Sequence, residues 1–187
     1  MTYLKRKRVF VDVGAHIGHF VFNALGVFKE VIAFEPVPAN FQCLERNVAA
    51  RQEKTHKKTS VRLFNAAVGK EQLHKPDVWY KDPSNGENSG AWELSLTDTG
   101  GALLKTDVLT LDALDLRVCD LIKIDTQGWE SEVIKGGVKT LEACRPILIV
   151  EMINERTFND SLMEEIMALN YRMHAMVQKN GIFKYAG

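Results

Sequence analysis

Short apolar runs and longer stretches with helical spacing alternate along most of this chain. The apolar runs predict strands over Val9–Val13, Val31–Phe34, Val61–Phe64, Leu121–Ile124 and Ile147–Val150. Between the first runs, residues 18–28 and the segment that starts at Pro38 place apolar residues at helical spacing. Strands that alternate with helices form a parallel sheet through right-handed crossovers. We therefore expect an α/β fold that binds ligands at the carboxyl ends of its strands.

The last part of the chain departs from this alternation and predicts an antiparallel hairpin. Leu162–Leu169 has the spacing of a helix, and strand-like runs follow at Tyr171–Val177 and Ile182–Tyr185. The Asn180-Gly181 pair between the two runs is a strong short-range hairpin signal. We therefore expect a mostly parallel seven-stranded sheet that closes with a terminal antiparallel hairpin.

Residues 75–101 follow neither pattern and predict a loop or flap inserted into one domain that spans residues 1–187. The centre of this segment, 82–90, is polar and rich in turn-forming residues, and loops of this length are often functional or disordered. Trp79, Tyr80 and Trp92 flank it. Either these aromatic side chains pack a local hairpin, or they have a ligand role beside a flexible flap over the acceptor. We expect residues 82–91 to be mobile without an acceptor and more ordered with one.

Composition excludes several classes of protein. The 24 Lys and Arg residues balance 24 Asp and Glu residues, so no basic field indicates nucleic acid as an obligate partner. The basic run Lys5–Arg8 is most simply a solvated lead-in to the first strand, and the alternatives are a localisation signal or an anion-binding arm. No apolar segment approaches a membrane span, and no signal peptide is recognisable. Cys43, Cys119 and Cys144 are scattered and suit a reducing compartment, so we expect a cytoplasmic protein.

The ends of the first two strands carry a signature for a cofactor that contains a nucleoside. Gly14 and Gly18 let the backbone approach a ligand, and Glu35 can accept hydrogen bonds from ribose hydroxyls. A dinucleotide would need glycine at positions 16 and 19, where this chain has His16 and His19. S-adenosylmethionine has a ribose and an adenine but no phosphate, and it suits this spacing better. The alternative is that both glycines only form a tight turn.

A second group of polar residues follows two later strands. Asp125 leaves the tip of one strand, Glu130 lies near the start of the next helix, and Glu151 ends another strand. A carboxylate placed beside a hydroxyl can assist the loss of its proton. Glu130 has an alternative role in stabilising the helix N-terminus, and His16 an alternative role in packing. A divalent cation between Asp125 and Glu130 is a weaker alternative, and we predict no metal.

Taken together, these segments resemble the FkbM family of S-adenosylmethionine-dependent O-methyltransferases. The matching segments are 10–18, 33–38, 65–69, 109–112, 122–130 and 146–151. Each motif is weak alone, but their order and spacing over residues 9–151 are specific. The resemblance implies a Rossmann-like class I methyltransferase fold. It also implies a hydroxyl acceptor on a sugar, a glycan or a natural product.

The resemblance also implies site residues. The implied cofactor-binding residues are Asp12, Gly14, Ala15 and Gly18 around the methionine moiety, Glu35 on the ribose, Asn65, Ala66 and Ala67 beside the adenine, and Asp125 near the reacting methyl. His16 and Pro36, which lie in the same two motifs, are also expected to bind the cofactor. The catalytic candidates are Asp125, Glu130 and Glu151. Gln127 stands where many members carry Glu, so it receives no role as a base. The rival functions are a nucleotide-dependent oxidoreductase and a catalytically silent binding or assembly module.

Overall fold

The protein is described by a computed structural model that covers residues 4–81, 93–97, 100–152 and 160–187. Its main sheet contains the strands β1 (Val9–Val13), β2 (Glu30–Phe34), β3 (Ser60–Phe64), β9 (Leu121–Ile124), β10 (Ile147–Glu151), β11 (Tyr171–Val177) and β12 (Asn180–Tyr185). The strand order is β11-β12-β10-β9-β1-β2-β3. Every neighbouring pair is parallel except those made by β12, which runs antiparallel to β10 and β11. The predicted mostly parallel, seven-stranded sheet with a terminal hairpin is therefore confirmed.

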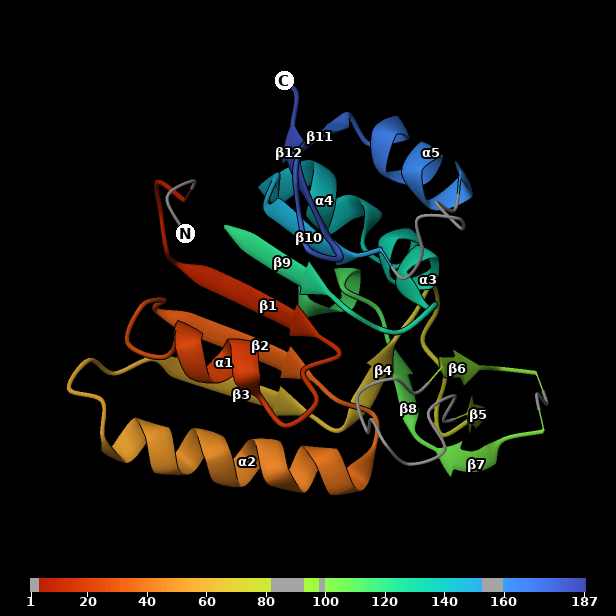
Figure 1. The fold of residues 1–187 in the computed structure, drawn as a ribbon, viewed down its shortest axis with the longest axis horizontal. Coiled ribbons are helices and arrows are strands. Elements are labelled where there is room, and N and C mark those ends of the chain that lie inside the picture. Colours follow the sequence, from red (N-terminus) through yellow and green to blue (C-terminus); the bar gives the residue numbers. More distant parts are fainter. Residues whose placement is uncertain (1–3, 82–92, 98–99, 153–159) are drawn as a thin grey trace.

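Helices cover both faces of this sheet (Figure 1). The helices are α1 (His19–Ala24), α2 (Pro38–Glu53), α3 (Glu130–Lys135), α4 (Val138–Cys144) and α5 (Asp160–Ala168). Side chains alternate along β1, so Phe10 packs with α1 and α2 while Val11 and Val13 pack with α3, α4 and α5. A strand buried on both faces is apolar along nearly its whole length, and this explains the pattern at Val9–Val13, which is broken only by Asp12. None of the described helices is long and apolar enough to cross a membrane.

The two helices on the α1 side differ in how well the sequence predicted them. The helix expected over residues 18–28 is only six residues long, because Leu25 adopts extended backbone angles and Gly26 has φ 76°. The second helix begins at Pro38, as expected, because proline in the first turn loses no helical hydrogen bond. Its Leu44 is fully buried against the sheet.

The terminal hairpin is present, but its turn lies two residues earlier than predicted. Val177 pairs with Asn180, so the turn consists of Gln178 and Lys179, and Gln178 takes the positive φ of 53°. Gly181 lies inside β12, where an added Cβ would stand 2.8 Å from the Phe183 ring. The glycine therefore serves close packing and not the turn.

Two small sheets occupy the region between β3 and β9. One pairs β4 (Ala66–Val68) with β8 (Asp107–Leu109), and the other joins β5 (Asp77–Lys81), β6 (Glu93–Ser95) and β7 (Ala102–Lys105) in the order β6-β5-β7. In Figure 1 the arrowheads of β1, β2, β3 and β9 point toward these strands. Trp79 and Tyr80 lie in β5, which agrees with local packing. Trp92 and the predicted flap 82–91 lie outside the described residues.

Candidate functional site

A cavity of about 300 Å³ lies at the carboxyl ends of β1, β2, β9 and β10. This volume is in the range of small-molecule sites. It brings together most of the residues predicted to bind a cofactor or to act on an acceptor. The predicted residues that line it are Gly14, Ala15, His16, Glu35, Pro36, Ala66, Ala67, Asp125 and Glu151.

The turn after β1 brings the backbone of this strand against the tip of β9. Gly14 has φ 78°, and a Cβ added there would stand 1.9 Å from the carbonyl oxygen of Asp125. The amides of Gly14 and Ala15 both donate to the carbonyl of Phe34, at 3.1 and 2.9 Å. Only glycine therefore fits at position 14, for reasons of backbone angle and of space.

Gly18, by contrast, does not line the cavity. It lies at the N-cap of α1 with φ 94°, and a Cβ there would stand 2.6 Å from Cδ1 of Leu44. A glycine is therefore needed at position 18 because α1 packs closely against Leu44 of α2. The predicted contact of Gly18 with a cofactor has no support in this geometry.

Glu35 lies at the tip of β2 and connects two loops of the site. Its carboxylate accepts hydrogen bonds from the amides of His16 (2.8 Å) and Val37 (3.0 Å) and from Nδ2 of Asn40 (3.4 Å). The side chain is buried, and this burial raises the pKa of Glu35 although the hydrogen bonds oppose the shift. A carboxylate has about four lone-pair sites, so these contacts leave room for a ribose hydroxyl.

The loop after β3 completes this part of the cavity. Nδ2 of Asn65 donates to the carbonyls of Glu35 (2.8 Å) and Pro36 (3.0 Å). Asn65 therefore braces the loop after β2 and does not itself line the cavity. Ala66 and Ala67 do line it, and their small side chains leave space beside β4.

Lys123 is a central residue of the site that the sequence reasoning missed. Its Nζ lies 3.2 Å from Oδ1 of Asp12, 3.2 Å from Oδ2 of Asp125 and 3.4 Å from the carbonyl oxygen of Gly14. The Lys123 side chain is only 3% exposed and that of Asp12 is fully buried, so each charge needs these partners. The available signal was a charged residue inside the apolar run 121–124.

The electrostatics of this cluster follow from its burial. Burial lowers the pKa of Lys123, but the two carboxylates beside it outweigh that effect and raise the pKa above its usual value. Burial also raises the pKa of Asp12, and Lys123 offsets only part of this rise. Asp12 does not line the cavity, so its described role is to hold Lys123 and not to contact a ligand.

Asp125 and Glu151 form a second cluster through Gln127. Nε2 of Gln127 donates to Oδ1 of Asp125 at 2.9 Å and also to Oε2 of Glu151. Burial raises the pKa of Asp125, but a hydrogen bond with Glu151, the charge of Lys123 and the Gln127 amide bring it below its usual value. Burial and the neighbouring Asp125 carboxylate raise the pKa of Glu151 to about 8. The two pKa values are therefore shifted in opposite directions, downward for Asp125 and upward for Glu151.

Glu130 lies at the first position of α3 and does not line the cavity. Its carboxylate accepts hydrogen bonds from the amides of Thr126 (2.9 Å) and Gly128 (3.0 Å) and from the Thr126 hydroxyl (3.1 Å). These contacts hold the loop that carries Asp125, as expected for a carboxylate at a helix N-terminus. The geometry favours this structural role, and a catalytic role for Glu130 stays an untested prediction.

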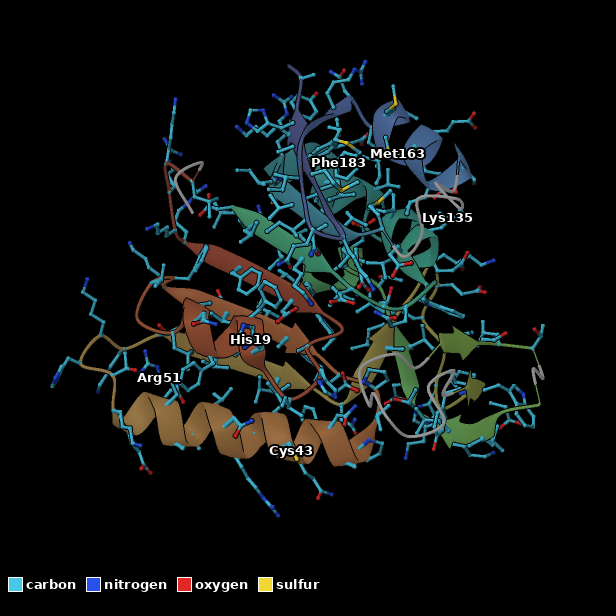
Figure 2. The ribbon with its side chains drawn as sticks, in the orientation of Figure 1. His19, Cys43, Arg51, Lys135, Met163 and Phe183 are labelled. Atoms are coloured by element: carbon cyan, nitrogen blue, oxygen red, sulfur yellow. The ribbon has the colours of Figure 1, made fainter. Side chains whose placement is uncertain are left out.

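The described ranges, 4–81, 93–97, 100–152 and 160–187, contain no group of three or more His, Cys, Asp or Glu residues placed to hold a metal ion. His19 and Phe20 of α1 also line the cavity, although sequence reasoning assigned them no role there. Figure 2 shows His19 on α1, beside the end of β1.

Comparison with known proteins places this geometry in a family. The family model of the methyltransferase FkbM domain matches residues 12–174. No curated protein matches the chain. Among solved structures, a methyltransferase FkbM from Methylobacillus flagellatus is similar, with a TM-score of 0.66, 21% sequence identity and 96% of this chain covered. The match covers 44% of that protein, so this chain spans less than half of its length.

Two further structures share the fold at lower identity. A precorrin-6Y C5,15-methyltransferase from Geobacter metallireducens has a TM-score of 0.55 and 13% identity over 97% of this chain and 80% of that one. A magnesium protoporphyrin IX methyltransferase from Synechocystis, solved with bound S-adenosylmethionine, has a TM-score of 0.54 and 8% identity over 95% of this chain and 69% of that one. These likenesses establish the predicted Rossmann-like methyltransferase fold.

Proposed function

The chain belongs to the FkbM methyltransferase family, and on that premise we propose that it is an S-adenosylmethionine-dependent O-methyltransferase. The proposed acceptor is a hydroxyl on a sugar, a glycan or a natural product. The observation that carries the proposal is the placement of the carboxyl pair Asp125 and Glu151 in the same cavity as Glu35 and the Gly14 turn. One end of the cavity suits a nucleoside, and the other suits removal of a proton.

The residues present fit S-adenosylmethionine. Glu35 retains acceptor capacity for a ribose hydroxyl, Ala66 and Ala67 leave space for the adenine, and the Gly14 turn exposes backbone beside Asp125. When bound, the cofactor would supply a methyl group attached to a positively charged sulfur. Because the sulfur leaves as a neutral thioether, it is already an activated leaving group. The protein then has to align the acceptor and exclude water, and such alignment can account for most of the rate.

We propose that Asp125 accepts the proton of the acceptor hydroxyl. Its lowered pKa favours the carboxylate form, and the side chain lies at the cavity, held from three sides by Lys123, Gln127 and Glu151. Glu151, whose pKa is raised, would keep its own proton and help to orient the acceptor. A positioned base of this kind contributes roughly 10²–10⁴-fold to the rate.

A cytoplasmic location also stays a prediction, which rests on the cysteine pattern.

The rival oxidoreductase needs room for a pyrophosphate at the turn after β1. His16 lies at the middle position of that turn with φ 52° and lines the cavity, so its side chain occupies the space that glycine would leave. This argues against a dinucleotide. A silent binding module would have no need of the Asp125, Gln127 and Glu151 arrangement, which supports catalysis over that alternative.

Calorimetry with S-adenosylmethionine, its demethylated product S-adenosylhomocysteine and NAD tests the cofactor. We expect both sulfur compounds to bind and NAD not to bind. Glu35→Ala should weaken binding by about 1–3 kcal/mol, since it removes acceptors for the ribose and the two loop amides. The matched control is Glu30→Ala at the other end of β2, where Glu30 contacts only the half-buried Arg62 among the described ion pairs. Equal binding by wild type and Glu35→Ala would contradict the proposed site.

The acceptor requires a second experiment. Fractionated extracts are incubated with the protein and methyl-labelled S-adenosylmethionine, and mass spectrometry then identifies the compounds that acquire the label. We expect labelled hydroxyl groups in a sugar, a glycan or a natural product. Label on nitrogen or carbon would correct the O-methylation and leave the methyltransferase assignment in place.

A further inference from the structure

We propose that Lys123 is a positioning residue whose ammonium group keeps the Asp125 carboxylate ionised and directed into the cavity. Through Asp125 it sets the preference of the site for the cationic sulfonium of S-adenosylmethionine over the neutral thioether of S-adenosylhomocysteine. This inference rests on the proposed function, because it needs S-adenosylmethionine in the cavity. It concerns a residue that the proton transfer described above uses only indirectly.

The sheet register places Lys123 where it can do this. Asp12 of β1 and Lys123 of β9 are direct partners in the parallel pair, so their side chains emerge on the same face. From there the ammonium reaches Asp125, two residues further along the chain, and the carbonyl of Gly14 in the facing turn. An ammonium has three protons, and these three acceptors use all of them.

This arrangement ties together the two loops that frame the reacting end of the cavity. One acceptor belongs to the Gly14 turn and another is Asp125 itself, so Lys123 fixes the carboxylate relative to the turn. Phe20 covers the ammonium on the helix side, with its ring centroid 4.7 Å from Nζ. The aromatic face stabilises the cation and restricts its exchange with water.

Several other ionisable groups face Asp125 or its cluster, and the test has to account for them. They are Asp12 of β1, His16 in the turn after β1, His19 at the start of α1, Glu35 directly after β2, Glu130 of α3, Glu151 of β10 and Lys179 of the hairpin turn. A variant of Lys123 leaves all of these in place. A difference between wild type and variant across pH therefore reports the loss of the ammonium.

The consequence of removing Lys123 follows from charge alone. Without the ammonium, Asp125 would face the buried Asp12 with no cation between them, and like charges in a buried setting raise the pKa of a carboxyl group. Asp125 would then take up a proton at a pH where the wild type stays ionised. A neutral carboxyl group attracts a sulfonium far less, whereas the neutral sulfur of S-adenosylhomocysteine is insensitive to the change.

The test measures the dissociation constants of S-adenosylmethionine and S-adenosylhomocysteine by calorimetry at pH 7.5 and pH 5.5. For wild type we expect the ratio of the two constants to stay nearly constant. For Lys123→Met we expect the preference for S-adenosylmethionine to fall about tenfold at pH 5.5 relative to pH 7.5. This is the change expected when the pH lies about one unit below the pKa of Asp125, because only about a tenth of the carboxyl groups are then ionised. Lys123→Arg keeps the charge and should retain the wild-type ratio.

Lys135→Met is the matched control, because Lys135 also contacts two carboxylates, Glu132 (3.4 Å) and Glu165 (3.2 Å). Figure 2 shows Lys135 on α3, well separated from His19 at the site. Its removal should change neither constant. If Lys123→Met is not folded by circular dichroism, Asp125→Asn replaces it and should lower the preference at both pH values.

The outcomes separate the two proposals. Failure of the wild type to bind either sulfur compound would overturn the proposed function and this inference with it. Binding by the wild type, with an unchanged ratio in the folded Lys123→Met variant or in Asp125→Asn, would overturn only the role of Lys123.

Discussion

Replacement of Gly14 by alanine would separate the β1 turn from the tip of β9. The added Cβ would stand 1.9 Å from the Asp125 carbonyl oxygen, so one of the two backbone segments must move. The φ of 78° also disfavours any side chain. Backbone strain of about 1–2 kcal/mol and a packing penalty of about 1–3 kcal/mol together predict a loss of roughly 3 kcal/mol in the free energy of unfolding.

Gly128→Ala is a matched control for this prediction. Gly128 also has a positive φ, 102°, but an added Cβ there meets no atom within 4 Å among the described residues. It should therefore cost only the backbone strain, about 1–2 kcal/mol. Urea denaturation gives both free energies, and for a chain of this length each kcal/mol shifts the melting temperature by about 2–4 °C. A loss for Gly14→Ala no larger than that for Gly128→Ala would refute the close approach of the two segments.

Two further predictions concern the acids of the site. Glu130→Gln should lower the free energy of unfolding by about 1–2 kcal/mol, since its carboxylate accepts hydrogen bonds from the Thr126 and Gly128 amides, while calorimetry should show unchanged cofactor affinity. A large loss of methyl transfer in this variant would restore Glu130 as a catalytic candidate. Burial raises the pKa of Glu151 from 4.5 to about 8, so the folded protein favours the protonated carboxyl group. The resulting contribution to the free energy of unfolding is complete below pH 4.5 and is lost as the pH rises through 8. Urea denaturation from pH 6 to 9 should therefore show a decline for wild type that Glu151→Gln lacks, and parallel curves would contradict the shift.

Part of the fold was predictable because it depends on local pattern. β1 and β9 match their predicted bounds residue for residue, since strands buried on both faces are apolar at nearly every position. The exceptions are Asp12 and Lys123, which pair with each other. The start of α2 at Pro38 was also predictable, because proline suits only the first turn of a helix. The ends of these elements brought Gly14, Glu35 and Asp125 to one edge of the sheet without further information.

Other parts of the fold depend on contacts between distant segments. The hairpin turn moved to Gln178 and Lys179 because β12 pairs with β10 as well as with β11, and this pairing draws Asn180 and Gly181 into the strand. The strands β4 and β8 are three residues each and are separated by about forty positions of chain. Segments this short carry too little pattern to be predicted before their partners are known.

The sequence by itself determined that Gly14, Glu35, Asp125 and Glu151 reach the cavity edge, because strand ends and glycine turns are local properties of the chain. The tertiary structure alone decided which of these groups meet. Asp12 turned away from the cavity to pair with Lys123, because the parallel register of β1 and β9 aligns the two positions and a buried carboxylate needs a cation. In the same way, the neighbouring positions of β9 and β10 brought Glu151 within reach of Gln127 and Asp125 and so produced the carboxyl pair. Spacing along the chain cannot specify such pairs, because strand order and register decide which side chains lie side by side.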